Sequence, residues 1–121
     1  MSAARTLVKE DGVLFIEMLN PLRYRHGAEQ FSTARRLTPS IVLHSVIDVD
    51  WVHQSLNTIN TIVDSSDIIG VYDEKLRFVY PSELELMAAA SGFTVEILRS
   101  DWRGSPLESW SPGLAAVLRA E

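Results

Sequence analysis

The segment "NPLRYRHG" carries the side chains best suited to chemistry. It follows the strongly apolar stretch Val13–Leu19, and so occupies the side on which α/β sheets bind ligands. His26 could act as a general base or a substrate contact, although a solvated loop histidine is the interpretation we favour. Asn20, Tyr24 and Arg25 could line a substrate pocket, while Asn-Pro could equally be a simple strand terminator and the arginine part of a solvated basic loop.

A second polar group lies in "HSVIDVDWVHQ", where two histidines accompany two aspartates and suggest metal ligation. Residues an odd number apart face opposite sides of a strand. His53 and Asp48 would therefore point in opposite directions, and we expect no metal site. His53 remains a candidate for a substrate contact.

Composition limits the classes of function. The chain has 121 residues, 46% of them hydrophobic, a net charge of −5 and no cysteine. This size suits one domain with a modest core, and the acidic balance argues against nucleic-acid binding. Without cysteine there is no disulfide or thiolate nucleophile. The N-terminal residues do not resemble a secretory signal and no apolar run reaches membrane length, so we expect a cytoplasmic protein.

The first half of the chain predicts one helix and one buried strand before a polar segment. Residues 3–10 suit a short amphipathic helix whose apolar face is formed by Ala4, Leu7 and Val8. Val13–Leu19 is apolar on both faces except for Glu17, which is typical of a buried parallel strand. Residues 22–40 are polar and basic, and we expect a loop with one or two helical turns.

Residues 41–80 predict an antiparallel meander. Alternation marks a half-exposed strand around residues 46–53, and further strands are expected at 56–63, 68–72 and 76–80. The turns are placed at "DSSD" and "YDEK", which are rich in residues that favour turns.

The stretch "FVYPSELELMAAASGF" predicts a strand, a capped helix over residues 82–91 and a second strand. Ser82 and Glu85 have the spacing of a capping box, and Gly92 suits the left-handed end of the helix. A buried stripe is expected on one helix face, formed by Leu84, Met87, Ala88 and Ser91. Trp102 and Trp110 are expected to cover the edges of the core, whereas exposed tryptophans would instead suggest an interface.

The motifs "DGVLFIEMLNP", "FVYPSELELMAAASGFTVE", "DWRGSPLESWSP" and "LAAVLR" together resemble the C-terminal half of a class I S-adenosylmethionine-dependent methyltransferase. The resemblance covers residues 3–20 and 76–119. It implies an α/β fold, the C-terminal part of a Rossmann-like sheet with an inserted antiparallel meander. Val13–Leu19, Phe93–Arg99 and residues 114–119 would be neighbours, with the last strand central and antiparallel.

The resemblance implies a single domain in three parts. Residues 1–20 would supply a helix and the fifth strand of the family's sheet, and residues 21–80 the substrate-side loop and meander. Residues 81–121 would supply the helix and the last two strands.

The family binds its cofactor on its first four strands, and a glycine-rich loop after the first strand lets the backbone approach the ligand. The six glycines of this chain are scattered singly. The resemblance therefore implies that S-adenosylmethionine, if it is used, is bound mainly by a partner chain.

Three hypotheses for the function follow. The chain is half of a split small-molecule methyltransferase, a non-catalytic binding or dimerisation module of the same fold, or a small α+β ligand-binding protein. We favour the first, because the substrate-side loop keeps polar side chains. Since the strand before Val13–Leu19 in the family's sheet is missing, we expect this strand to pair with another polypeptide or a second copy.

Overall fold

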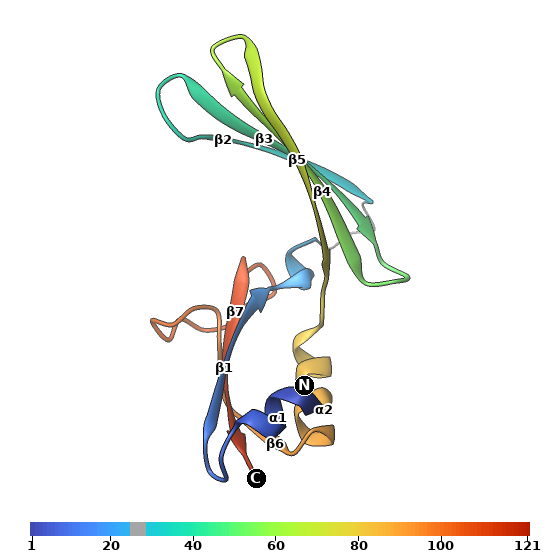
Figure 1. Ribbon diagram of the computed structural model, residues 1–121, viewed down its shortest axis with the longest axis vertical. Helices are drawn as coiled ribbons and strands as arrows, with labels where there is room; N and C mark the ends of the chain where they lie inside the picture. The colour runs from blue at the N-terminus through green and yellow to red at the C-terminus, as the bar shows by residue number, and fades with distance from the viewer. Residues whose placement is uncertain (25–28) are drawn as a thin grey trace. The chain divides into compact units, whose positions relative to one another are not determined.

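The computed structural model describes residues 1–24 and 29–121. The chain forms two compact units, Met1–Arg25 with Val79–Glu121, and His26–Phe78. Each unit has its own antiparallel sheet (Figure 1). No helix in the described residues is long and apolar enough to cross a membrane.

The first unit is built on a three-stranded sheet of β1 (Val13–Leu19), β6 (Phe93–Arg99) and β7 (Gly113–Ala120). The strand order is β1-β7-β6, and β7 pairs antiparallel with both neighbours. This arrangement confirms the prediction that the last strand lies in the centre of the sheet. The fold is accordingly mixed α/β, as the sequence predicted.

Helix α2 (Pro81–Ala90) covers one face of this sheet and closes the core. Leu84 and Ala88 of the helix are buried against Phe93, Leu114 and Leu118 of the strands. Burying one such large apolar side chain contributes about 1.5–3 kcal/mol. The short helix α1 (Ser2–Leu7) reaches this core through Arg5, whose guanidinium carbon lies 6.0 Å from the centre of the Phe93 ring.

The start of α2 differs from the prediction. Tyr80 is the N-cap and Pro81 the first helical residue, a position that suits proline because its missing N–H would have no helical partner. The carboxylate of Glu83 accepts the backbone N–H of Tyr80 at 3.1 Å. The predicted capping pair, Ser82 and Glu85, was therefore wrong by two residues. Gly92 has φ of 80°, which confirms the left-handed helix end.

Three other expectations about apolar faces were wrong. Met87 of α2 is 40% exposed, so the predicted buried stripe does not include it. Leu7 is 86% exposed because α1 ends at this residue, before the predicted helix end at residue 10. Val8 does pack against the core. In β1, only Leu14, Ile16 and Met18 pack against the core, so this strand is covered on one face and not on both.

The second unit is a four-stranded meander in the order β2-β3-β4-β5. Its strands are β2 (Gln30–Arg36), β3 (Ile41–Asp50), β4 (Ser55–Asp64) and β5 (Asp67–Arg77). The antiparallel meander is confirmed, but it begins earlier than predicted, because β2 lies in the segment expected to be a loop. The 3-10 turn η1 (Pro21–Tyr24) is the helical turn expected there.

The turn at "DSSD" is confirmed, since β4 ends at Asp64 and β5 begins at Asp67, with Ser65 at φ of 57°. The turn at "YDEK" was wrong, because β5 runs through these residues without a break. Asn60 donates to the Glu74 carboxylate at 3.1 Å, which ties this polar part of β5 to β4. The polar sequence therefore marks an exposed edge strand.

Candidate functional site

The carboxyl end of β1 is anchored by Asn20, the first of the predicted site residues. The side chain is fully buried, and its amide nitrogen donates to the carbonyl oxygens of Glu108 at 3.2 Å and Ser111 at 3.0 Å. Its amide oxygen accepts the backbone N–H of Leu22 at 3.2 Å. Asn20 thus connects the end of β1 to the loop that leads into β7, and its polar atoms are engaged within the chain.

Tyr24 lies one turn further on, at the end of η1. It is half-buried, and the guanidinium carbon of Arg23 lies 5.3 Å from the centre of its ring. The backbone N–H of Arg23 donates to the Asn20 carbonyl at 3.3 Å, so the structure brings Asn20 and Tyr24 to the same end of the sheet. Arg25 and His26 lie outside the described residues, and their predicted roles stay predictions.

A hollow of about 540 Å³ opens at this end of the three-stranded sheet. Its lining comes from the last residues of β1, the residue after β6 and the start of β7: Glu17, Met18, Leu19, Ser100, Pro112 and Gly113. Ligands of α/β proteins bind outside the carboxyl ends of strands. The hollow is therefore a candidate ligand-binding site, and sequence reasoning missed its loop residues because they carry no distinctive side chain.

Trp102 lies next to this hollow, over the face of the sheet opposite to α2. Its indole N–H donates to the Glu17 carboxylate at 2.8 Å, and its ring meets that of Phe15 edge to face at 5.9 Å. Trp102 is 51% exposed and Trp110 is 72% exposed. The expectation that both tryptophans cover core edges was wrong, and exposed tryptophans are typical of interfaces.

His53 belongs to the other unit, in the turn between β3 and β4 and not in a strand. It is exposed, and its Nδ1 lies 2.8 Å from the carboxylate of Asp50. Asp50 also accepts the backbone N–H groups of Val52 and His53 at 3.0 Å. The hydrogen bonds from the backbone and side chain of His53 lower the pKa of the Asp50 carboxyl. This pair fixes the turn, and its role in substrate binding stays a prediction.

A second hollow, of about 320 Å³, lies across β3, β4 and β5 in the same unit. Asp48, Asn57 and Lys75 face each other there across adjacent strands. The side-chain oxygen of Asn57 is buried and accepts no hydrogen bond from the described residues. Its exposed carboxylate neighbours make this a polar patch without a converging catalytic group.

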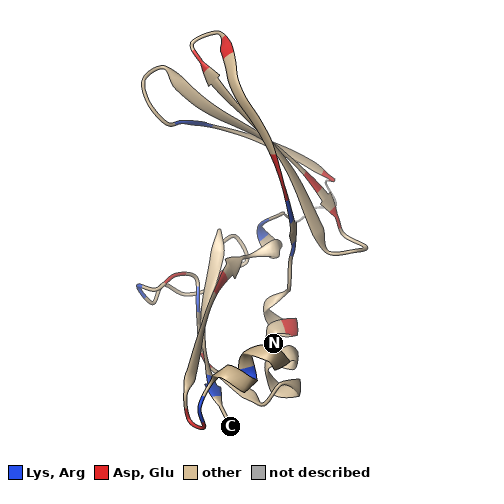
Figure 2. Ribbon diagram, viewed as in Figure 1, with Lys and Arg blue, Asp and Glu red and all other residues tan. Residues whose placement is uncertain are grey.

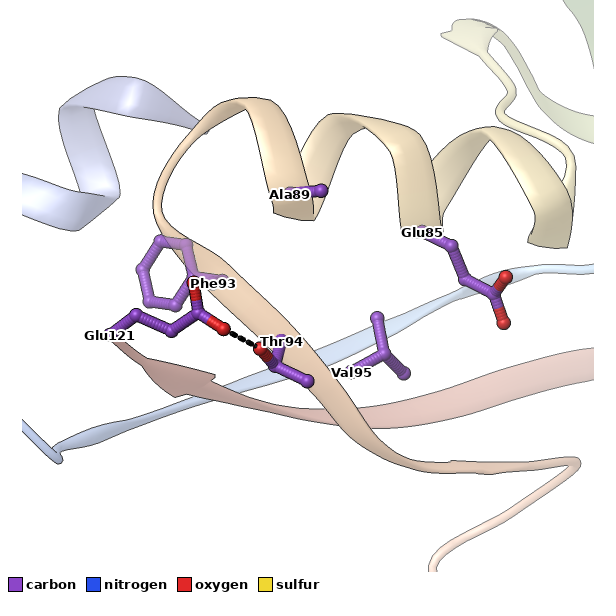
Figure 3. Close-up of a pocket in the computed structure, with 6 residues that line it drawn as sticks. All are labelled: Glu85, Ala89, Phe93, Thr94, Val95 and Glu121. Carbon is purple, nitrogen blue, oxygen red and sulfur yellow. Dashed lines mark hydrogen bonds between the residues drawn. The ribbon is translucent and has the colours of Figure 1, made fainter.

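A third hollow, of about 300 Å³, lies between α2 and the beginning of β6 (Figure 3). The Thr94 hydroxyl donates to the Glu121 carboxylate beside the ring of Phe93, while the carboxylate of Glu85 points away from this pair (Figure 3). The two acids do not converge. The hollow also lies at the amino end of β6, opposite to the end where ligands of such sheets bind.

The described residues do not form a glycine-rich loop of the kind that binds nucleotide cofactors. Gly12 precedes β1, Gly70 and Gly113 lie in strands, Gly92 ends a helix and Gly104 lies in a loop. Within the described part of the chain, none of them forms a glycine-rich turn between a strand and a following helix. The described residues also contain no group of three or more histidines and acids that could hold a metal ion.

Comparison with solved structures finds methyltransferases. The CcbJ methyltransferase from Streptomyces caelestis matches 99% of this chain with a TM-score of 0.87 and 24% sequence identity. An S-adenosylmethionine-dependent methyltransferase from Clostridium acetobutylicum matches 98% with a TM-score of 0.75 and 9% identity. CalS10, an amino pentose methyltransferase from Micromonospora echinaspora, matches 99% with a TM-score of 0.61 and 15% identity. The chain shares their fold.

The match is partial on the other side. This chain covers 51% of the CcbJ chain and 48% of each of the other two, so it spans about half the length of these methyltransferases. No protein-family model matches the sequence, and no curated protein matches it.

Proposed function

We propose that this chain is the C-terminal, substrate-side half of a small-molecule S-adenosylmethionine-dependent methyltransferase, and that a partner chain supplies the cofactor site. The observation that carries the proposal is the fold. Almost the whole chain matches about half of several methyltransferases, and its sheet has the order β1-β7-β6 with an antiparallel central strand.

A small-molecule substrate is supported by the nature of one similar structure, an amino pentose methyltransferase. The hollow at the carboxyl ends of β1 and β6, beside Asn20, is the proposed substrate side, and Tyr24 is a further proposed substrate contact. Histidine can take a proton near neutral pH. His26 is therefore the proposed general base for the acceptor group, with Arg25 and His53 as further proposed substrate contacts.

A non-catalytic binding module of the same fold is the alternative. The observation in its favour is Asn20, whose side-chain donors and acceptor are all engaged inside the chain. Such a residue stabilises the fold and needs no substrate to explain it. In that case the partner would bind this chain without gaining methyltransferase activity.

Isothermal titration calorimetry with S-adenosylmethionine tests the proposal. The purified chain is expected to show no saturable binding, whereas its complex with the native partner is expected to bind at micromolar concentration. The complex should also transfer a radiolabelled methyl group to small molecules from the native host. A complex without cofactor binding would favour the non-catalytic module, and saturable binding to the chain alone would contradict the split enzyme.

A further inference from the structure

The backbone of β1 points half of its hydrogen-bonding groups away from the sheet. The residues just before and just after β1 are hydrogen-bonded to the β7 side of the sheet. The Ala120 N–H donates to the Gly12 carbonyl at 2.9 Å, and the Asn20 N–H donates to the Pro112 carbonyl at 3.3 Å. Between them the register is regular, from Val13↔Arg119 to Leu19↔Gly113. Bonded pairs alternate in an antiparallel ladder. The backbone N–H and C=O groups of the even-numbered residues of β1 therefore bond to β7. Those of the odd-numbered residues point away from β7, toward the open edge.

The outward groups are the N–H and C=O of Val13, Phe15, Glu17 and Leu19. No strand in the described residues pairs with this edge. Figure 2 shows that β1 carries almost no charge along its length, and Glu17 is its one ionisable residue. Such an edge favours pairing with another strand.

The same odd-numbered residues place their side chains on the sheet face opposite to α2. Phe15 is 64% exposed there, and its cross-strand neighbours Val117 and Ile97 lie on the same face. Trp102 borders this group through its contact with Phe15. An exposed apolar patch around Phe15 and Ile97 and an open backbone edge thus meet at one strand.

We propose that this edge and face together form the docking surface for the complementary methyltransferase half. This inference rests on the proposed function. The partner would add a strand to the edge of β1 and cover Phe15, Ile97 and Trp102 with apolar side chains of its own.

Two observations favour this occupant over a second copy of the chain. Edge-to-edge pairing of two copies would extend the sheet but would leave the face around Phe15 and Ile97 exposed. A complementary half brings its own layers, and the similar methyltransferases contain as much chain again as the part matched here. One partner can then satisfy the edge and the face at once.

Amide hydrogen exchange of the full chain, read by NMR, tests the pairing. In the isolated chain the amides of Leu14, Ile16 and Met18 should exchange slowly and those of Phe15 and Glu17 fast. In the complex purified from the native host, the amides of Phe15 and Glu17 should slow by about tenfold or more. A complex in which they still exchange fast would overturn the inference, and so would a chain that remains a monomer with no partner.

Two matched variants test the face. Phe15→Lys should weaken partner binding by about 30-fold, while Leu86→Lys, on the exposed side of α2, should leave it unchanged. Equal effects would overturn the proposal. Slowing of the same amides with rising concentration of the chain alone would instead identify a second copy as the occupant and overturn the partner assignment. Cofactor binding is read separately. A docked complex that does not bind the cofactor would support this docking surface and contradict the proposed function. A complex that binds the cofactor while the amide exchange of Phe15 and Glu17 is unchanged would contradict the docking surface alone.

Discussion

The two edges of the three-stranded sheet are built differently. The register of β6 shifts between Val95 and Ile97, which breaks the regular ladder beside β7. Its Glu96 forms an ion pair with Arg119 of the neighbouring strand. β1 instead pairs regularly over all seven residues. Its single acid, Glu17, accepts the indole N–H of Trp102.

Soluble proteins protect exposed sheet edges with bulges and charges. The edge of β6 has both kinds of protection, and that of β1 has neither over most of its length. The contrast supports the proposal that the sheet is completed on the β1 side. The sequences differ in the same way, because β1 (VLFIEML) has one polar residue and β6 (FTVEILR) has three.

The largest expected effect compares one phenylalanine from each outer strand. Phe93 of β6 is 1% exposed in the core, so Phe93→Ala should lower the free energy of unfolding by about 3–5 kcal/mol. Phe15→Ala on β1 removes an exposed ring with one aromatic contact, and should cost less than about 1 kcal/mol. Urea denaturation of the isolated chain measures both. Comparable losses would show that the face carrying Phe15 is already covered in the isolated chain.

A smaller effect is expected at the end of β1, which is anchored although its edge is open. Asn20→Ala removes the donor for the carbonyls of Glu108 and Ser111, and should cost about 1–3 kcal/mol. Thermal unfolding followed by circular dichroism measures the loss. Thr6→Ala, which removes an exposed hydroxyl bonded to Ala3, is the control and should have little effect. An unchanged midpoint for Asn20→Ala would show that the loop before β7 is held by other contacts.

The smallest effect concerns the ion pair on β6. Hydrogen bonds from Arg119 lower the pKa of the Glu96 carboxyl below its usual 4.5. A lowered pKa in the folded state stabilises the fold above the unfolded value, and this contribution is lost as the pH falls through the folded pKa. Wild type should therefore exceed Glu96→Gln in stability at pH 7 by a small margin that shrinks below about pH 4.5. Urea midpoints measured across this range check the trend; a margin that grows as the pH falls would contradict it.

The sequence predicted the three-stranded sheet because its signals are local or carried by the family resemblance. Pro81 begins the ten-residue helix α2, Gly92 lies just beyond its end, and the apolar strand β6 follows directly. β2 was missed because only Phe31 on its inward face is strongly apolar, and its pairing with β3 involves polar residues such as Thr33 and Ser45. An edge strand exposed on both faces has no apolar period to detect.

The candidate site was harder to predict. The partners of Asn20 are the carbonyls of Glu108 and Ser111, 88 and 91 positions away, and no local pattern announces such a contact. The hollow beside it is lined partly by Ser100 and Gly113, whose side chains carry no chemical signature. Sequence reasoning placed its candidate residues after β1, at the end of the sheet where this hollow opens, but it did not identify the groups that line the hollow.

The meander also has a consequence for how the chain folds. Its contacts are short in sequence, such as Ser45 with Asn60 at a separation of 15, whereas the first unit must join residues 91 positions apart. Gln30, Asp48, Asn57 and Lys75 lie in one row across the four strands. Once the meander has formed, its two ends are separated by three strand spacings, about 14 Å. A meander that folds first would therefore turn a long flexible loop into a short rigid one, and would lower the entropy that β1 and β7 lose when they pair.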